Sequence, residues 1–212
     1  MTESDALSAG ARELGISLVP DARDRLIRFA ALLRRWNAAF NLVSRRDMSR
    51  LVPRHLLDAL SLQPYLRGTH VLDLGTGAGL PGVPLAIVCP SLQFTLVDRT
   101  ARRIRFVQQV AAELALRNVQ AIVADFDEFR PAALFDTVVS RAVAAPTRLW
   151  EAAAPLLGPD GQALLQIGSD AVELANDGVK VERFELRIPG LASSHQLLRI
   201  TRRSAVHQEV EK

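Results

Sequence analysis

Apolar residues along the first third of the chain recur at helical spacing. Three- and four-residue intervals separate the apolar residues Leu26, Phe29, Leu33, Trp36 and Phe40. This spacing predicts a helix with one apolar stripe, and Asp21 just before the stripe is a candidate cap. A second, shorter helix is expected over Met48–Leu62, with Pro64 close behind it. Residues 1–66 are therefore predicted to form an N-terminal helical region.

From Thr69 onward the pattern changes to short apolar runs that alternate with helical segments. Seven runs have the length and composition of strands, namely His70–Leu74, Gln93–Val97, Val119–Ala124, Thr137–Ser140, Ala163–Ile167, Arg183–Ile188 and Leu197–Ile200. Such alternation predicts an α/β fold in which helices cover both faces of a parallel sheet. We expect this second region to span residues 67–203, followed by a frayed polar tail at 204–212.

The first predicted strand runs directly into a glycine-rich turn. Residues 71–82 read Val-Leu-Asp-Leu-Gly-Thr-Gly-Ala-Gly-Leu-Pro-Gly. Glycines let a ligand approach the main chain, and the helix that follows directs its free N–H groups at that ligand. The junction is therefore a candidate nucleotide-cofactor site. Its spacing alone is ambiguous, because Gly77-x-Gly79-x-x-Gly82 also satisfies the dinucleotide fingerprint.

Two acidic residues favour one cofactor over the other. Asp73 stands two residues before the first glycine, where a carboxylate would repel a pyrophosphate but attract the ammonium of a methionine-like group. Asp98 ends the second strand, the usual place for a carboxylate that accepts ribose hydroxyls. Both favour S-adenosylmethionine, and with it a Rossmann-like seven-stranded methyltransferase sheet with an N-terminal helical extension. The alternative, that both aspartates only cap turns, stays open.

The basic residues suggest a polyanionic partner. The chain has 26 lysines and arginines, a net charge of +3 and a sequence pI near 9.7. All but Lys180 and Lys212 are arginines, and the clusters are Arg34/Arg35, Arg45/Arg46/Arg50/Arg54, Arg99/Arg102/Arg103/Arg105 and Arg199/Arg202/Arg203. Arginine binds phosphate through two parallel N–H groups, so the clusters together indicate docking on nucleic acid. Any single cluster is equally well explained as a solvated face.

Other classes of protein are disfavoured by composition. Cys89 is the single cysteine, and the four histidines show no metal-ligand spacing, so we expect neither an internal disulfide nor a metal. No apolar run approaches the ~18 residues of a membrane span, and the N-terminus lacks the features of a signal peptide. We therefore expect a cytoplasmic protein with no membrane partner. No long apolar helix face is left over, which favours a monomer.

Several sequence blocks are similar to one family, the ribosomal RNA small subunit methyltransferase G proteins, also called glucose-inhibited division protein B. The blocks are Arg35-Trp36-Asn37 with Phe40-Asn41-Leu42, Arg54–Leu60, the Asp73–Gly82 loop with Val83–Ala86, Leu96–Asp98 with Arg103–Phe106, and Phe135-Asp136 with Ser140-Arg141-Ala142. The resemblance runs from about residue 20 to residue 203. Three positions depart from the family pattern: Ile167 replaces an expected lysine, Val143 an aromatic residue and Ala101 a glycine.

The resemblance implies methylation of N7 of a guanine in the 16S rRNA of the small ribosomal subunit, with S-adenosylmethionine as donor. It adds cofactor contacts at Gly75, Leu80, Phe126, Asp127 and Arg141 to those already expected at Asp73, Gly77 and Asp98. Among these, Phe126 is suited to cover the adenine face, and Arg141 to hold a carboxylate or a phosphate.

The predicted chemistry demands alignment of the reactants. Guanine N7 carries a lone pair and loses no proton, so we expect no obligatory catalytic acid or base. Candidate RNA contacts are Asn41, Arg45, Arg46, Arg54, His55 and Arg141. Simpler readings are that Asn41 is a turn residue and that His55 pairs with Asp58 on one helical turn.

Other functions remain open at this stage. They are a methyltransferase of this fold acting on another RNA, a nicotinamide-dependent oxidoreductase that uses the overlapping glycine pattern, and a non-catalytic RNA-binding module.

Overall fold

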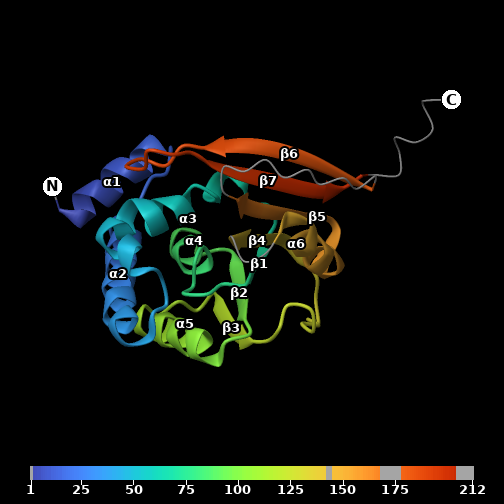
Figure 1. The fold of residues 1–212 in the computed structure, drawn as a ribbon, viewed down its shortest axis with the longest axis horizontal. Helices are drawn as coiled ribbons and strands as arrows, with labels where there is room; N and C mark the ends of the chain where they lie inside the picture. Colours follow the sequence, from blue (N-terminus) through green and yellow to red (C-terminus); the bar gives the residue numbers. More distant parts are fainter. Residues whose placement is uncertain (1, 142–144, 168–177, 204–212) are drawn as a thin grey trace.

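The computed structural model describes residues 2–141, 145–167 and 178–203. Its centre is a seven-stranded sheet with strand order β3-β2-β1-β4-β5-β7-β6 (Figure 1). The strands are β1 His70–Leu74, β2 Gln93–Asp98, β3 Val119–Val123, β4 Phe135–Arg141, β5 Leu157–Ile167, β6 Val179–Leu186 and β7 His195–Arg202. The α/β fold and its seven-stranded sheet are confirmed. The predicted tail at 204–212 and the departure at Val143 lie outside the described residues.

The sheet is mixed, which corrects the prediction of a parallel sheet. Strands β1 to β5 pair in parallel, but β7 is antiparallel to both of its neighbours, β5 and β6. Only residues 187–194 join β6 to β7, whereas a parallel crossover needs about a dozen residues or more. The register places Gln166 opposite Leu197 and Ile167 opposite Gln196. The first residues of β7 therefore lie beside the last residues of β5.

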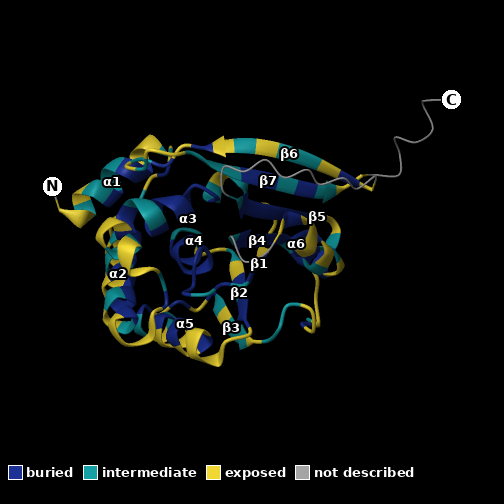
Figure 2. Cartoon of the chain, in the orientation of Figure 1, coloured by how far each residue is buried: buried dark blue, intermediate teal, exposed yellow. Residues whose placement is uncertain are grey.

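Helices cover both faces of the sheet. Successive side chains of a strand point to opposite faces, so each face carries apolar residues that a helix can bury. Val71 belongs to a core cluster shared with the N-terminal helices, and its neighbour Leu72 belongs to a second cluster on the opposite face. Figure 2 shows that β1, β5 and α4 are largely buried. The first cluster includes side chains from α1 Glu3–Glu13, α2 Pro20–Phe40, α4 Gly82–Val88 and α5 Ala101–Glu113. The second is covered by α6 Pro146–Ala153 and η4 Ala154–Leu156.

The chain before β1 is helical, with three differences in detail from the prediction. The region predicted as one helix over Met48–Leu62 is instead a run of short segments, η1 Arg45–Arg50, the π-helical η2 Val52–Leu57 and α3 Asp58–Leu60, followed by η3 Gln63–Tyr65. Asp21 is not the cap of α2. The helix begins at Pro20, whose fixed φ suits a first turn, and Asp21 instead forms an ion pair with Arg25 at 2.9 Å. Finally, the apolar stripe stops short of Phe40, which is 40% exposed.

The N-terminal helices and the sheet share one apolar core. Leu7 of α1, Phe29 of α2 and Leu197 of β7 all belong to the first core cluster. A division into a helical region at 1–66 and a sheet region at 67–203 stays a prediction. Within the described ranges, no helix combines the length and the apolar character needed to cross a bilayer.

Candidate active site

The glycine-rich loop joins β1 to α4 at the carboxyl edge of the sheet. Gly75, Gly77 and Gly79 have φ values of +77°, +56° and +78°, a conformation that side chains rarely adopt. A methyl group added at Gly77 would meet only the Gly75 carbonyl oxygen, at 4.0 Å. At Gly79 it would lie 2.6 Å from Val83, and at Gly82 2.7 Å from the Asp73 carboxylate. The last two glycines thus serve internal packing, and Gly77 leaves the backbone open to a ligand.

Asp73 stabilises this loop through hydrogen bonds to two of its residues. The side chain is fully buried, and its Oδ2 accepts hydrogen bonds from the Thr76 hydroxyl at 2.6 Å and the Gly82 N–H at 2.8 Å. Burial raises the pKa of the carboxyl to about 6, against the lowering effect of these two hydrogen bonds. Its Oδ1 has no hydrogen-bond partner within the described chain. The predicted role of Asp73 beside a methionine-like ammonium stays a prediction, and Oδ1 is the atom available for it.

Asp98 links the end of β2 to the same loop. Its Oδ2 accepts a hydrogen bond from the Gly77 N–H at 3.0 Å, and its Oδ1 accepts one from the Thr100 N–H at 2.8 Å. Arg103, in the first turn of α5, lies 3.3 Å from the carboxylate. This carboxylate therefore stands beside the open face of Gly77, where a ribose would need an acceptor.

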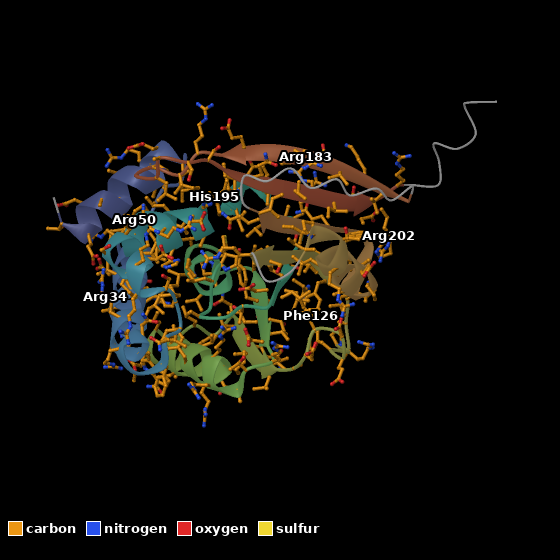
Figure 3. All side chains as sticks on the ribbon, viewed as in Figure 1. Arg34, Arg50, Phe126, Arg183, His195 and Arg202 are labelled. Carbon is orange, nitrogen blue, oxygen red and sulfur yellow. The ribbon has the colours of Figure 1, made fainter. Side chains whose placement is uncertain are left out.

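Phe126, labelled in Figure 3, and Asp127 lie in the connection that follows β3. They line a cavity of about 330 Å³ together with Arg148 of α6. The Arg148 guanidinium lies 5.9 Å from the centre of the Phe126 ring and forms an ion pair with Asp127. Leu80, by contrast, is 4% exposed and belongs to the apolar core.

The residues of this edge fit an adenosine-containing cofactor. Gly77 offers open backbone, Asp98 offers a carboxylate beside it, and Phe126, just after β3, offers an aromatic ring. Metal ligation has no comparable support: in the ranges that the structure describes, no three His, Cys, Asp or Glu side chains group in a way that would hold an ion.

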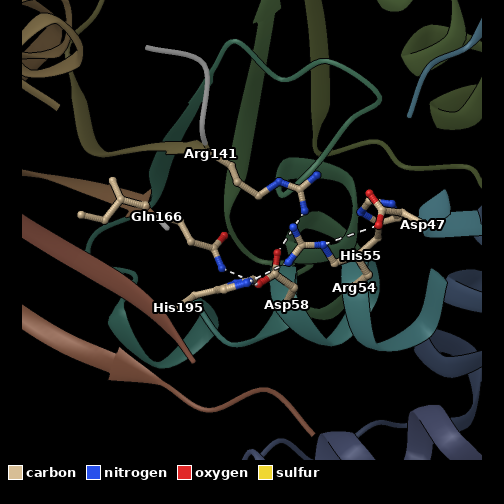
Figure 4. Close-up of a pocket in the computed structure, with 8 residues that line it drawn as sticks. Asp47, Arg54, His55, Asp58, Arg141, Gln166 and His195 are labelled. Carbon is tan, nitrogen blue, oxygen red and sulfur yellow. Dashed lines mark hydrogen bonds and ion pairs between the residues drawn. The ribbon is translucent and has the colours of Figure 1, made fainter. Parts of the chain in front are cut away.

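A second pocket lies at the carboxyl ends of β4 and β5 and at the start of the antiparallel strand β7. Arg141 of β4 is paired with Gln166 of β5, and Gln166 with Leu197 of β7. Since side chains two residues apart share a face, His195 and Leu197 lie on the same side of β7. Segments η2 and α3 cover this face. The resulting cavity of about 260 Å³ is lined by Asp47, Arg54, His55, Asp58, Arg141, Gln166, Ile167 and His195 (Figure 4).

Asp58 is the centre of this pocket. It is 2% exposed and accepts hydrogen bonds from Arg141 Nη1 at 3.0 Å and from Gln166 Nε2 at 2.6 Å, and the His195 Nδ1 lies 2.7 Å away. Burial alone would raise the pKa of this carboxyl, but the His195 hydrogen bond and the Arg141 charge outweigh burial and lower it. The proposed pairing of His55 with Asp58 is wrong, because the partners of Asp58 come from three strands.

His195 is held between a carboxylate and a guanidinium. Arg54 Nη1 lies 2.8 Å from His195 Nε2. Arginine can only donate, so Nε2 is the acceptor and the imidazole carries its hydrogen on Nδ1, which donates to Asp58. Arg54 Nε is also 3.8 Å from the Asp47 carboxylate. These contacts fix both the ring and the guanidinium at the mouth of the pocket.

Two buried polar groups in the pocket have no partner among the described residues. They are the His55 imidazole, through both ring nitrogens, and Gln166 Oε1. Burial lowers the pKa of His55 to about 4, so its imidazole is uncharged at neutral pH. An unpaired buried polar atom facing a cavity is a group that a bound ligand can satisfy.

The predicted RNA contacts fall into two sets. Arg54, His55 and Arg141 converge in the pocket. Asn41 does not line it; this residue ends α2 in a left-handed conformation with φ 46°, as a turn residue does. Arg45 and Arg46 are exposed at the start of η1. Whether any of these residues touches RNA stays a prediction.

Gln166 and His195 were not predicted as site residues. A glutamine that interrupts an apolar run just before the end of a strand is a usable signal for Gln166. Nothing around His195 distinguishes it, because Ser193-Ser194-His195-Gln196 reads as a loop. Of the departures from the family pattern, Ile167 lines the pocket, and Ala101 begins α5 on the surface.

Comparisons with known proteins identify related sequences. Residues 22–197 match the family described as rRNA small subunit methyltransferase G. A ribosomal RNA small subunit methyltransferase G from Chromohalobacter salexigens is 42% identical over 200 residues, covering 92% of this chain and 96% of that protein. One from Methylococcus capsulatus is 43% identical over 194 residues, covering 90% and 95%.

Solved structures share the fold at lower identity. The S-adenosylmethionine-dependent methyltransferase SibL superposes with a TM-score of 0.58 at 20% identity, covering 74% of this chain and 56% of that one. A putative methyltransferase from Thermoplasma acidophilum gives a TM-score of 0.53 at 17% identity, covering 65% and 70%.

Proposed function

This chain belongs to the rRNA small subunit methyltransferase G family, and we propose that it transfers a methyl group from S-adenosylmethionine to N7 of a guanine in 16S rRNA. The class of enzyme and the methyl donor follow from the family and the fold. One observation supports the meeting of donor and base. The glycine loop follows β1, the polar pocket lies at the end of β4, and these two strands are paired neighbours.

The glycine-rich loop and the residues after β2 and β3 are suited to hold the methyl donor in one orientation. S-adenosylmethionine supplies a methyl group on a positively charged sulfur. The open backbone at Gly77 and the carboxylate of Asp98 would hold it, with Asp73 fixing the shape of the loop. Phe126 and Asp127 are the proposed contacts to its adenine.

The polar pocket around Asp58 is suited to bind a nucleotide. Arg141 donates one N–H to Asp58, and its remaining guanidinium hydrogens can bind a phosphate or a carboxylate. Its side chain is 21% exposed, and it is the last residue of β4, the strand paired with β1 on one side and with β5 on the other. Arg54 and His55 line the same pocket. We therefore keep Arg141 as a contact to both ligands.

Guanine N7 needs no help with a proton. Its lone pair lies in the plane of the base, and bond formation to the methyl carbon releases no hydrogen. The gain comes from alignment, with N7 held about 3 Å from the methyl carbon on the carbon–sulfur axis. The residues of the glycine-rich loop and of the polar pocket therefore act by positioning the two reactants, and no side chain is an obligatory acid or base.

The proposed partner is the 16S rRNA or the small ribosomal subunit, bound by a monomer. Since the major groove of an RNA helix is too narrow for side chains, the target guanine is expected in a loop or splayed from its stack. The exposed arginines at the start of η1 lie close in sequence to the pocket residue Arg54 and would follow the backbone. A nicotinamide-dependent oxidoreductase is not favoured, because the family and the fold are those of methyltransferases.

The direct test is transfer of labelled methyl from S-adenosylmethionine to small subunits and to naked 16S rRNA that lack the modification. Chemical cleavage at 7-methylguanosine then locates the product. Label at one guanine N7 is the expected result, and its dependence on subunit or naked RNA identifies the substrate form. Label at another base atom, or none on either RNA despite cofactor binding, would contradict the proposal.

A further inference from the structure

Gln166 lines the polar pocket and carries a buried hydrogen-bond acceptor of fixed orientation. The residue is 3% exposed, and its Nε2 donates to Asp58 Oδ1 at 2.6 Å. Turning the amide over would set its oxygen against a carboxylate, so this contact fixes which atom is which. Its Oε1 is buried and has no hydrogen-bond partner in the described chain. The acceptor is thus oriented before any ligand binds.

A second glutamine shows that the pocket gives Gln166 its special position. Gln162 lies four residues earlier on the same strand and face, and its Oε1 is also buried without a partner among the described residues. Its Nε2, however, is bonded to the Tyr65 carbonyl and the Thr137 hydroxyl, away from the pocket. Only Gln166 shares a cavity with Arg141 and with the unpartnered imidazole of His55.

We propose that Gln166 determines base specificity, with its Oε1 accepting a hydrogen bond from the N1–H or the N2 amino group of the target guanine. This inference rests on the proposed function and names the residue that reads the substrate. Guanine carries two N–H donors on that edge, whereas adenine presents an N1 lone pair there, which an acceptor repels. Guanine O6, on the same edge, suits the remaining N–H groups of Arg141.

The position of the pocket agrees with the reacting atom. N7 belongs to the five-membered ring, on the side of guanine opposite to N1 and N2. A base that directs N1 and N2 toward β5 therefore directs N7 away from that strand. The strand on the other side of β4 is β1, which ends in the glycine loop.

The test combines a protein variant with changes to the base. Q166M removes the Oε1 acceptor, together with the Nε2 donor to Asp58, while keeping the side chain's length. Because of this second loss, the decisive readout is the coupling with the base changes: target guanosine is replaced either by inosine, which lacks the N2 amine, or by 1-methylguanosine, which lacks N1–H. Methyl transfer and RNA binding are measured for each pairing on the RNA form that the wild-type protein methylates. We expect Q166M to lower kcat/KM on guanosine by about tenfold to a hundredfold, chiefly through KM. One of the two base changes should lower wild-type kcat/KM similarly and have little further effect on Q166M.

The matched control is Q162M, which removes the same group from the same strand outside the pocket. It should respond to both modified bases as the wild type does. Full additivity of Q166M with both base changes, or an unaltered kcat/KM for Q166M, would overturn the inference. If Q166M does not fold, wild-type protein alone decides, since equal rates on guanosine and both analogues would also overturn it. Failure of wild-type transfer to guanosine would instead count against the proposed function.

Discussion

Asp73 and Asp58 are both buried beside the carboxyl ends of the strands, yet their pKa values shift in opposite directions. Asp73 accepts hydrogen bonds from a hydroxyl and a backbone amide, both uncharged, so burial dominates and raises its pKa to about 6. Asp58 faces the Arg141 guanidinium and the His195 imidazole, which outweigh burial and lower its pKa. The glycine-rich loop thus tolerates a neutral acid, whereas the pocket is organised around a charge.

This difference follows from how each region is built. The loop comes from one continuous stretch, residues 73–82, whose polar groups are largely satisfied by its own backbone and by β2. The pocket is assembled from η2, α3 and three strand ends, and its groups satisfy one another. Removing one member of the pocket therefore leaves other buried groups without partners, which the loop largely avoids.

The largest effect is expected from D58N. Loss of the carboxylate charge leaves Arg141 without its partner in a mostly buried site, which should lower the free energy of unfolding by about 3 kcal/mol or more. Urea denaturation at pH 7 measures this. The control is D127N, whose pair with Arg148 is 42% and 53% exposed and is worth less than ~1 kcal/mol. Equal losses for the two variants would show that the Asp58 charge does not organise the pocket.

A pH series on D73N tests the other side of the comparison. The folded pKa of Asp73 is about 6 and lies above its ordinary value of 3.8, so the folded state holds the proton more tightly. This group's contribution to stability is therefore complete below about pH 4 and is lost as pH rises through 6. Wild type should gain up to about 3 kcal/mol relative to D73N between pH 7 and pH 4. Parallel unfolding curves for the two proteins across this range would contradict the assignment.

Two glycine variants separate packing from ligand access within the loop. G82A places a methyl 2.7 Å from the Asp73 carboxylate and 2.9 Å from Leu96, so it should lower stability by about 1–3 kcal/mol. G77A places its methyl 4.0 Å from its nearest neighbour, the Gly75 carbonyl oxygen, so the variant should cost only about 1 kcal/mol, from its positive φ. Thermal shift with S-adenosylmethionine completes the test: G77A should lose more of the ligand-induced rise in Tm than its own stability loss explains. A full rise in G77A would show that Gly77 is not part of the cofactor site.

The smallest change in stability is expected from the double variant R45Q/R46Q. Both side chains are exposed and have no ion-pair partner in the described ranges, so the free energy of unfolding should stay within about 0.5 kcal/mol. RNA binding should weaken, and its salt dependence should become shallower by about 0.7 per lost phosphate contact. The control is R187Q, on the connection between β6 and β7, which should leave the slope unchanged. Equal slopes for both variants would exclude η1 from the RNA-binding surface.

The sequence predicted the loop better than the pocket for a physical reason. Hydrophobic alternation located all seven strands of the described chain, although the predicted starts of β5, β6 and β7 were too late. The acids at the ends of β1 and β2 were identifiable because their partners lie nearby in sequence or on the next strand. Gln166 and His195 become part of the pocket through their contacts with Asp58, which lies 108 and 137 residues earlier in the sequence. The antiparallel direction of β7 was also missed, since an apolar run carries no information on its direction. Without that direction, His195 falls at the wrong edge of the sheet.

The antiparallel entry of β7 also has a consequence for biosynthesis. Because His195 follows Asp58 by 137 residues, ribosomes translating at about 5–20 residues per second need roughly 7–30 s to supply it. During that interval the nascent chain holds the Asp58 carboxylate with an incomplete set of partners. The glycine-rich loop waits for a much shorter time, because its partners on β2 end at Asp98, 25 residues after Asp73. The order of synthesis therefore places assembly of the polar pocket among the last events in the maturation of this enzyme.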